Sequence, residues 1–188
     1  MDFATSIEAG TAPAGPRLEG RGVRADEVAW GGRLHSRPVK APYIAVCGSS
    51  EPTQRQRELA REVGRLLAEA GAVVLCGGLG GVMEAVAEGA ARAGGMVVGI
   101  LPGPDRSAAN PHLSVAIATG LGEARNAVLA CAADGMIAIG GGWGTLSEIA
   151  LARRRGRPVV GLDTWTLAGL RTVGSAQEAV AAALGRDG

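Results

Sequence analysis

The residues best suited to chemistry are one carboxylate and one guanidinium, each close to a glycine-rich segment. Glu148 lies in "GGGWGTLSE", directly after the apolar run "GMIAI", and Arg125 lies in "TGLGEARN", directly after "SVAIA". Glycines at a strand end allow positive φ and close approach of a ligand, and the N–H groups that begin the next helix favour an anion. A guanidinium has a permanent charge and donors that suit phosphate. The pattern therefore predicts a site for a phosphate-bearing ligand.

Both residues also have a structural explanation. Thr145 and Glu148 match the S/T-x-x-E/Q capping box, in which the two side chains stabilise the start of a helix, and so do Thr53 with Gln56 and Ser175 with Glu178. Arg125 can be a surface arginine on a helix. A cation in the first turn of a helix is disfavoured by the helix dipole, however, and a bound anion would offset that cost. A carboxylate beside a sugar can stabilise the positive charge that develops when a glycosidic bond breaks, or activate water. Binding is predicted, and the sequence leaves open whether chemistry follows.

Other predicted strand ends carry further candidates, because the carboxyl ends of parallel strands meet at one edge of a sheet. The turns "GSSEP" and "GGLGGVME" follow two strands, and the second could hold a phosphate together with "GGGWGT". Asn110 and His112 fall in a loop near this edge that we expect to be solvated. The predicted ligand-binding residues are Gly48, Ser49, Gly78, Gly80, Gly81, Met83, Glu84, Gly120, Arg125, Asn126, Gly141, Gly142, Trp143, Gly144, Thr145 and Glu148.

Several common sites are excluded or disfavoured. Lys40 is the only lysine, so no lysine follows the glycines as the P-loop GxxxxGK[ST] requires. The last glycine of the dinucleotide motif GxGxxG would be Met83 in one turn and Thr145 in the other, which argues against classical NAD binding. A net charge of +1 and an aromatic content of 3% argue against nucleic-acid binding through bulk charge or base stacking.

Cysteine usage and hydropathy predict a soluble cytoplasmic protein without a membrane partner. The three cysteines, Cys47, Cys76 and Cys131, lie in or next to apolar runs, as reduced thiols of a cytoplasmic protein do. The spacing of the two histidines does not indicate a base for a catalytic cysteine, and no metal site is predicted. The sequence shows neither a signal-peptide pattern nor an apolar run of roughly 18 residues.

The elements that must position these residues are recognisable from Pro42 onward. Short apolar runs alternate with helical segments, as in repeated βα units around a parallel sheet. We therefore predict an α/β fold: a single doubly wound, Rossmann-like domain over residues 41–188, with a mostly parallel sheet of six or seven strands flanked by helices. Residues 1–40 are predicted to be a loosely structured N-terminal extension that Trp30 could anchor. The expected helices cover about 53–70, 81–93, 122–133, 145–155 and 175–184.

Three segments together resemble the LOG-type (lonely guy) superfamily, often described as lysine decarboxylase-like. They are "CGGLGGVMEAVAEGA", "GLGEARN" and "GGWGTLSE", and the likeness extends from about Pro42 to the C-terminus. Within the superfamily the chain is most similar to the branch of the molybdenum-cofactor carrier proteins and their bacterial relatives. The superfamily signature is PGGxGTxxE with an upstream arginine in a segment like MxxRK.

The resemblance implies cleavage of nucleoside 5′-monophosphates to free base and ribose 5-phosphate, with Arg125 and Glu148 as the catalytic pair. It also places Gly141, Gly142, Gly144 and Thr145 in the phosphate loop. In two positions the chain departs from the enzymes: Gly140 replaces the leading proline, and Asn126 stands where they carry lysine. Both departures are shared in kind with the carrier-like branch.

The resulting functional expectation is binding of a phosphate-bearing nucleotide or molybdopterin-type ligand at the carboxyl edge of the sheet, as in a carrier. No cofactor is required, and the bound ligand would be a nucleoside monophosphate or the molybdenum cofactor. One alternative is a phosphoribohydrolase of the LOG type, and another is a non-catalytic structural subunit. We expect a homo-oligomer, a dimer or larger, that does not bind nucleic acid.

Overall fold

The computed structural model describes residues 41–186, and the extension predicted for residues 1–40, including Trp30, lies outside them. The strands are β1 (Tyr43–Gly48), β2 (Val73–Cys76), β3 (Val97–Leu101), β4 (Val115–Ala118), β5 (Gly135–Ile139), β6 (Val159–Leu162) and β7 (Arg171–Val173). The helices are α1 (Gln54–Glu69), α2 (Val82–Arg92), α3 (Arg125–Ala132), α4 (Trp143–Arg154) and α5 (Ala176–Ala183), with a 3-10 turn, η1 (Gly122–Ala124), before α3. These elements match the ranges predicted from the sequence closely.

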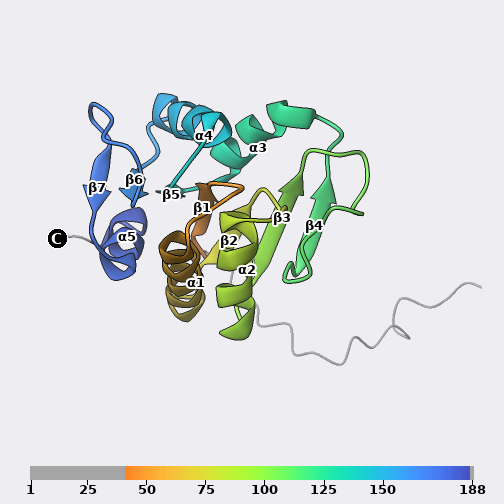
Figure 1. The fold of residues 1–188 in the computed structure, drawn as a ribbon, viewed down its shortest axis with the longest axis horizontal. Coiled ribbons are helices and arrows are strands. Elements are labelled where there is room, and N and C mark those ends of the chain that lie inside the picture. Colours follow the sequence, from red (N-terminus) through yellow and green to blue (C-terminus); the bar gives the residue numbers. More distant parts are fainter. Residues whose placement is uncertain (1–40, 187–188) are drawn as a thin grey trace, which may run out of the picture. The chain divides into compact units, whose positions relative to one another are not determined.

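The strands form one parallel sheet in the order β4-β3-β2-β1-β5-β6-β7 (Figure 1). The chain begins in the middle with β1, adds β2, β3 and β4 on one side, and then returns to place β5 on the other side of β1. This confirms the predicted α/β, Rossmann-like architecture. In such a sheet the connections that leave β1 and β5 diverge, and ligands bind in the crevice at the carboxyl ends of these two strands.

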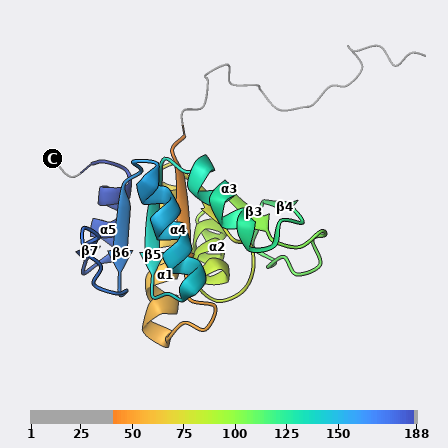
Figure 2. The ribbon, with the colours of Figure 1, turned by 90° about the horizontal axis from the view of Figure 1, so that it is seen from above.

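Two hydrophobic cores lie on the two faces of the sheet. Ile44 and Val46 of β1 belong to the core beneath α1, α2 and α5, whereas Ala45 and Cys47 belong to the core beneath α3 and α4. Figure 2 shows α3 and α4 together on one side of the sheet. Because both faces are covered, the central strands are apolar at almost every position, which explains the continuous apolar runs in the sequence.

The predicted capping boxes are only partly present. Thr53 caps α1 as expected, because its hydroxyl accepts from the N–H of Gln56 and the Gln56 side chain accepts from the N–H of Thr53. The predicted box between Thr145 and Glu148 is wrong. Helix α4 begins earlier, with Gly142 as its N-cap, so Thr145 accepts from the N–H of Gly142 and Glu148 lies beyond the first turn.

At the start of α5, Ser175 accepts from the N–H of Glu178 as predicted. The Glu178 carboxylate, however, accepts from the N–H of Gly174 and not from that of Ser175, so this capping box is also incomplete.

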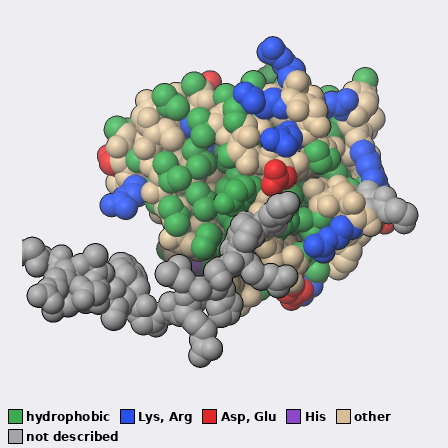
Figure 3. Space-filling model, turned by 180° about the vertical axis from the view of Figure 1, so that it is seen from behind, with side chains coloured by type: hydrophobic (Ala, Val, Ile, Leu, Met, Phe, Trp, Pro, Cys, Tyr) green, Lys and Arg blue, Asp and Glu red, His purple; other side chains and the backbone are tan. Residues whose placement is uncertain are grey.

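The β4 edge of the sheet presents apolar side chains to solvent. Val115 and Ile117 of β4 are each 44% exposed, and Figure 3 shows hydrophobic side chains gathered on the face opposite α1 and α2. An exposed apolar patch often marks an interaction surface, and the expected homo-oligomer stays a prediction. Among residues 41–186, no helix is both long and apolar enough to cross a membrane.

Candidate functional site

A cavity of about 260 Å³ lies at the crevice between the carboxyl ends of β1 and β5. Its walls come from the loop after β1, the first turn of α2, the start of α3 and the first turns of α4. The lining residues are Gly48, Ser49, Ser50, Met83, Arg125, Asn126, Gly142, Trp143, Gly144, Thr145 and Glu148. Most of the residues predicted to bind a ligand are thus brought together where the sheet topology places a binding crevice.

Arg125 is the cation of this cavity. It is the first residue of α3 and only 8% exposed, and its Nη1 donates to the carbonyl of Ile100 at 2.9 Å. Its buried Nε has no hydrogen-bond partner among the described residues. Burial lowers the pKa of the guanidinium, and the nearby Glu148 opposes this shift. Because a buried cation without full pairing is costly, the arrangement favours an anionic ligand.

Glu148 is the carboxyl group of the same cavity and is 7% exposed. Burial raises its pKa from 4.5 to about 7, while the charge of Arg125 and the Cys47 thiol act in the opposite direction. In turn, burial and the nearby Glu148 raise the pKa of Cys47, so this thiol stays protonated and is a poor nucleophile. A carboxyl group that titrates near neutrality can accept or release a proton, as a general acid or base must.

The glycines of the loop between β5 and α4 fall into two kinds. A Cβ at Gly141, where φ is 151°, would lie 2.7 Å from the indole of Trp165, so packing explains this glycine. A Cβ at Gly142 or Gly144 would meet no atom within 4 Å. Packing within the described chain therefore does not require these two glycines. They leave open space at the N-terminus of α4, where backbone N–H groups favour an anion.

Asn126 and Ser147 connect α3 to α4 across the site. The Asn126 Nδ2 donates to the Ser147 Oγ at 3.0 Å, and this hydroxyl donates to the carbonyl of Gly144 at 2.7 Å. The two hydrogen bonds fix the Asn126 side chain, which is 7% exposed, beside Arg125 in the cavity wall.

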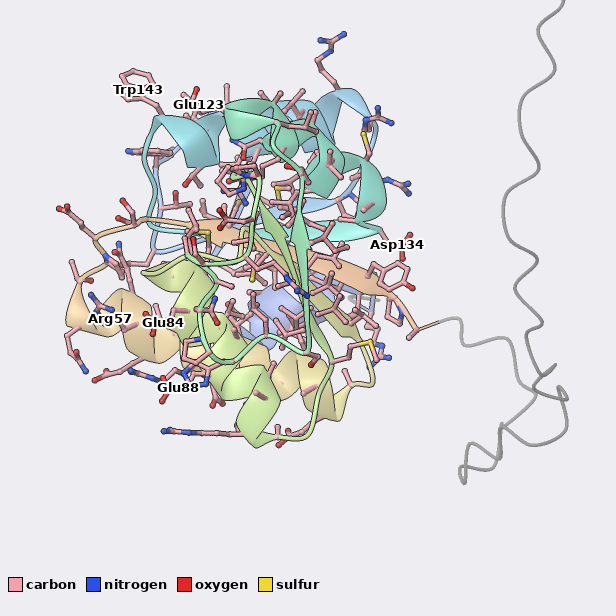
Figure 4. The ribbon with its side chains drawn as sticks, turned by 90° about the vertical axis from the view of Figure 1, so that its right-hand side faces the viewer. Arg57, Glu84, Glu88, Glu123, Asp134 and Trp143 are labelled. Carbon is pink, nitrogen blue, oxygen red and sulfur yellow. The ribbon has the colours of Figure 1, made fainter. Side chains whose placement is uncertain are left out.

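Six predicted site residues lie outside the lining of this cavity: Gly78, Gly80, Gly81, Glu84, Gly120 and Gly141. Gly81 is the N-cap of α2 with φ of 72°, and its backbone packs against the carbonyls of Ser49 and Ser50. Figure 4 shows Glu84 well separated from Trp143. The turn "GGLGG" thus supports the wall of the site, and the two glycine-rich turns do not line the cavity together.

Residues whose roles depend on distant contacts were not predicted from the sequence. A Cβ at Gly77 would overlap the guanidinium of Arg125 and the sulfur of Met83, so this glycine makes room for the arginine. Asn110 is buried, not solvated: its N–H donates to the Gly78 carbonyl at 2.9 Å and its Nδ2 to the Leu79 carbonyl at 3.1 Å. Gly77 is the first residue of the predicted turn "GGLGG", and this position was the only signal for it.

Comparison with known proteins places the chain in a family. The profile of the SLOG cluster4 family matches residues 41–184. The chain belongs to this family. An uncharacterised protein from Archaeoglobus fulgidus is 42% identical over 143 residues, which cover 76% of this chain and 94% of the archaeal one. The fold and family predicted from the sequence are thereby confirmed.

The solved structures of similar proteins include a molybdenum cofactor binding protein and a molybdenum cofactor carrier protein. The molybdenum cofactor binding protein of Rippkaea orientalis is 35% identical, with a TM-score of 0.71, over 74% of this chain and 93% of that one. The molybdenum cofactor carrier protein of Chlamydomonas reinhardtii is 32% identical, with a TM-score of 0.71, over 78% of this chain and 98% of that one. DNA processing protein A of Streptococcus pneumoniae, at 20% identity, shares the fold.

No cluster of three or more His, Cys, Asp or Glu side chains in residues 41–186 is arranged to hold a metal ion.

Proposed function

We propose that this chain binds the molybdenum cofactor, or a nucleotide-like ligand of similar chemistry, through its phosphate group and carries it without cleaving it. The observation that carries the proposal is Arg125, a residue only 8% exposed whose buried Nε has no partner among the described residues, in the wall of a cavity at the topological switch point. The similarity to proteins described as binding or carrying this cofactor supports the choice of ligand.

The residues present fit the phosphate of such a ligand. The open space at Gly142 and Gly144 admits a phosphate to the first N–H groups of α4, where the helix dipole favours negative charge by roughly 0.3 to 2 kcal/mol. The hydroxyl of Ser49 and the guanidinium of Arg125 line the same cavity and supply further donors. Charge-assisted hydrogen bonds of this kind are about twice as strong as neutral ones.

A second function, hydrolysis of a nucleoside 5′-monophosphate, is favoured by one observation. Glu148 has a pKa raised to about 7 and shares the cavity with Arg125. A carboxyl group in this range can serve glycosidic cleavage, either by stabilising positive charge on the sugar or by activating water. Asn126 replaces the lysine of the LOG-type signature, so the chain lacks one cation of those enzymes.

One experiment separates the two functions. The purified protein is incubated with isolated molybdenum cofactor and with a panel of nucleoside 5′-monophosphates; binding is followed by calorimetry and the release of free base by chromatography. A carrier binds at least one phosphate ligand and releases no base. Release of base with turnover assigns the hydrolase, and binding of none of these ligands overturns both functions and leaves a structural role.

A further inference from the structure

A second cavity, of about 420 Å³, adjoins the cavity of about 260 Å³ that Arg125 and Glu148 line, the anion cavity. The two share four wall residues, which are Arg125, Asn126, Trp143 and Gly144. The second is lined in addition by Leu79, Pro102, Gly122, Glu123 and Ser147. Small-molecule sites usually measure about 300 to 1,000 Å³, so the anion cavity of about 260 Å³ is too small for a whole nucleotide or pterin ligand. A ligand whose phosphate fills the first cavity must extend beyond it, and the second cavity shares more wall residues with the first than the neighbouring cavity beside Trp165 does.

Trp143 gives this second cavity a flat apolar wall. Residues 41–186 contain three aromatic residues, Tyr43, Trp143 and Trp165. Trp143 is 87% exposed, so its indole is not used to fill the core. It lines both cavities, and Leu79 and Pro102 add apolar surface to the second. Figure 4 shows Trp143 and Glu123 at the same edge of the molecule, with the indole directed outward. An exposed indole beside an anion site suits stacking with a planar heterocycle.

Apart from the Arg125 guanidinium, which both cavities share, and the indole N–H of Trp143, the polar side chains of the second cavity offer hydrogen-bond acceptors. The single hydroxyl proton of Ser147 goes to the Gly144 carbonyl, so Ser147 can only accept from Asn126. This fixes the Asn126 amide with its NH₂ toward Ser147 and leaves its oxygen available as an acceptor. The Glu123 carboxylate, exposed on the turn before α3, also accepts hydrogen bonds and does not donate them when ionised.

We infer that Trp143, Asn126 and Glu123 form a subsite for a heterocycle that presents adjacent N–H and NH₂ donors, the 2-amino-4-oxopyrimidine edge found in guanine and in pterins. The inference rests on the proposed phosphate site and specifies the ring that accompanies the phosphate. An adenine ring, which presents an amino group beside a ring acceptor, pairs poorly with a carboxylate that only accepts. The subsite therefore discriminates by the number of donors along one edge of the ring.

The test compares GMP, AMP and ribose 5-phosphate by calorimetry. GMP is expected to bind about tenfold more tightly than AMP, since a well-formed pair of hydrogen bonds to a base edge gives about this discrimination. Glu123→Gln should remove most of the GMP preference, and Trp143→Ala should weaken GMP and AMP alike by about tenfold through lost stacking. Neither variant should weaken ribose 5-phosphate, which has no ring to stack. Glu58→Gln, on the exposed surface of α1, is the matched control and should leave all three affinities unchanged.

The outcomes separate the subsite from the proposed function. Equal affinity of GMP and AMP, or an unchanged GMP preference in Glu123→Gln, overturns the subsite while the phosphate site stands. If ribose 5-phosphate, GMP and isolated molybdenum cofactor all fail to bind, the phosphate site fails as well. An unchanged thermal unfolding midpoint in each variant ensures that lost affinity does not reflect lost structure.

Discussion

Two of the regions that hold arginines beside a cavity differ in how the charges are neutralised. One is a surface cavity of about 470 Å³ between α1 and α2, larger than the anion cavity at the strand ends. There every arginine in the wall has a carboxylate partner: Arg61 pairs with Glu88 at 2.5 Å, Arg65 with Glu62 at 2.7 Å and Glu69 at 2.5 Å, and Arg92 with Glu88 at 2.7 Å.

Arg125 shows the opposite arrangement. It is buried, its Nη1 is bonded to a backbone carbonyl, and no ion pair joins it to a carboxylate within the described residues. The α1–α2 cavity is thus a solvated surface whose charges cancel, whereas the smaller cavity keeps a cation in surplus. Unsatisfied charge, and not cavity size, distinguishes the region that we propose as the ligand site.

The largest expected effect concerns the carboxyl groups of the two regions. Glu148 has a folded pKa of about 7, above its unfolded value of 4.5, so the folded state holds its proton across this interval. The free energy of unfolding should therefore fall by about 3 kcal/mol as the pH rises from 4.5 to 7, and level off above. The hydrogen bond from Arg65 lowers the pKa of Glu62. The stability that this pair contributes is therefore lost only as the pH falls below 4.5 and the carboxylate takes up a proton.

Urea unfolding of the protein and of Glu148→Gln at several pH values measures this effect. The glutamine has the shape of the protonated carboxyl and cannot ionise, so the variant should lose the fall in stability between pH 4.5 and 7 and be the more stable protein at pH 8. Titration of other groups is common to both proteins and cancels in the difference. The same pH dependence in both would mean that Glu148 is not protonated in the folded state near neutrality.

Replacement of an arginine in each region gives the next largest effect. Arg125→Met should raise the dissociation constant for the tightest phosphate ligand about 100-fold, because charge-assisted hydrogen bonds contribute about 1.5 to 3 kcal/mol. Arg125→Lys, which keeps the charge but loses the fork geometry, should give an intermediate value. Arg65→Met should leave the affinity unchanged. Calorimetry measures all three, with circular dichroism as the check on folding.

If Arg65→Met weakened the ligand as strongly as Arg125→Met, the contrast between a neutralised surface and a surplus cation would be wrong, and the ligand would lie on the α1–α2 surface. If neither substitution changed the affinity, the phosphate would be held by backbone donors alone.

The fold was predictable because its signals are local and repeated. Strands covered on both faces are apolar at nearly every position, and each is followed by glycine or polar residues at the carboxyl end. The start of α4 was mispredicted because Thr145 and Glu148 match a capping pattern, while the true N-cap, Gly142, has no side chain to indicate it. A glycine N-cap leaves no pattern that separates it from the glycines before it.

The site was predictable in part, for a related reason. Arg125 and Glu148 follow strands whose carboxyl ends meet, so their proximity follows from topology alone. The space that Gly77 leaves for the Arg125 guanidinium, and the hydrogen bonds that Asn110 makes to the Gly78 turn, join segments distant in the chain. Such contacts depend on the packed structure, and no periodicity or motif records them.

The smallest expected effect separates glycines needed for folding from glycines needed for binding. Gly144→Ala adds a Cβ that meets no atom within 4 Å, and alanine is favoured over glycine in a helix by up to about 1 kcal/mol, so the protein should be as stable or more stable. The same methyl group intrudes on a phosphate at the N-terminus of α4, and the ligand should bind about tenfold more weakly. Gly77→Ala should instead destabilise the fold, because its Cβ overlaps the Arg125 guanidinium. Chemical denaturation and calorimetry on both variants measure the two effects, and a Gly144→Ala protein that kept full affinity would place the phosphate elsewhere than on this helix.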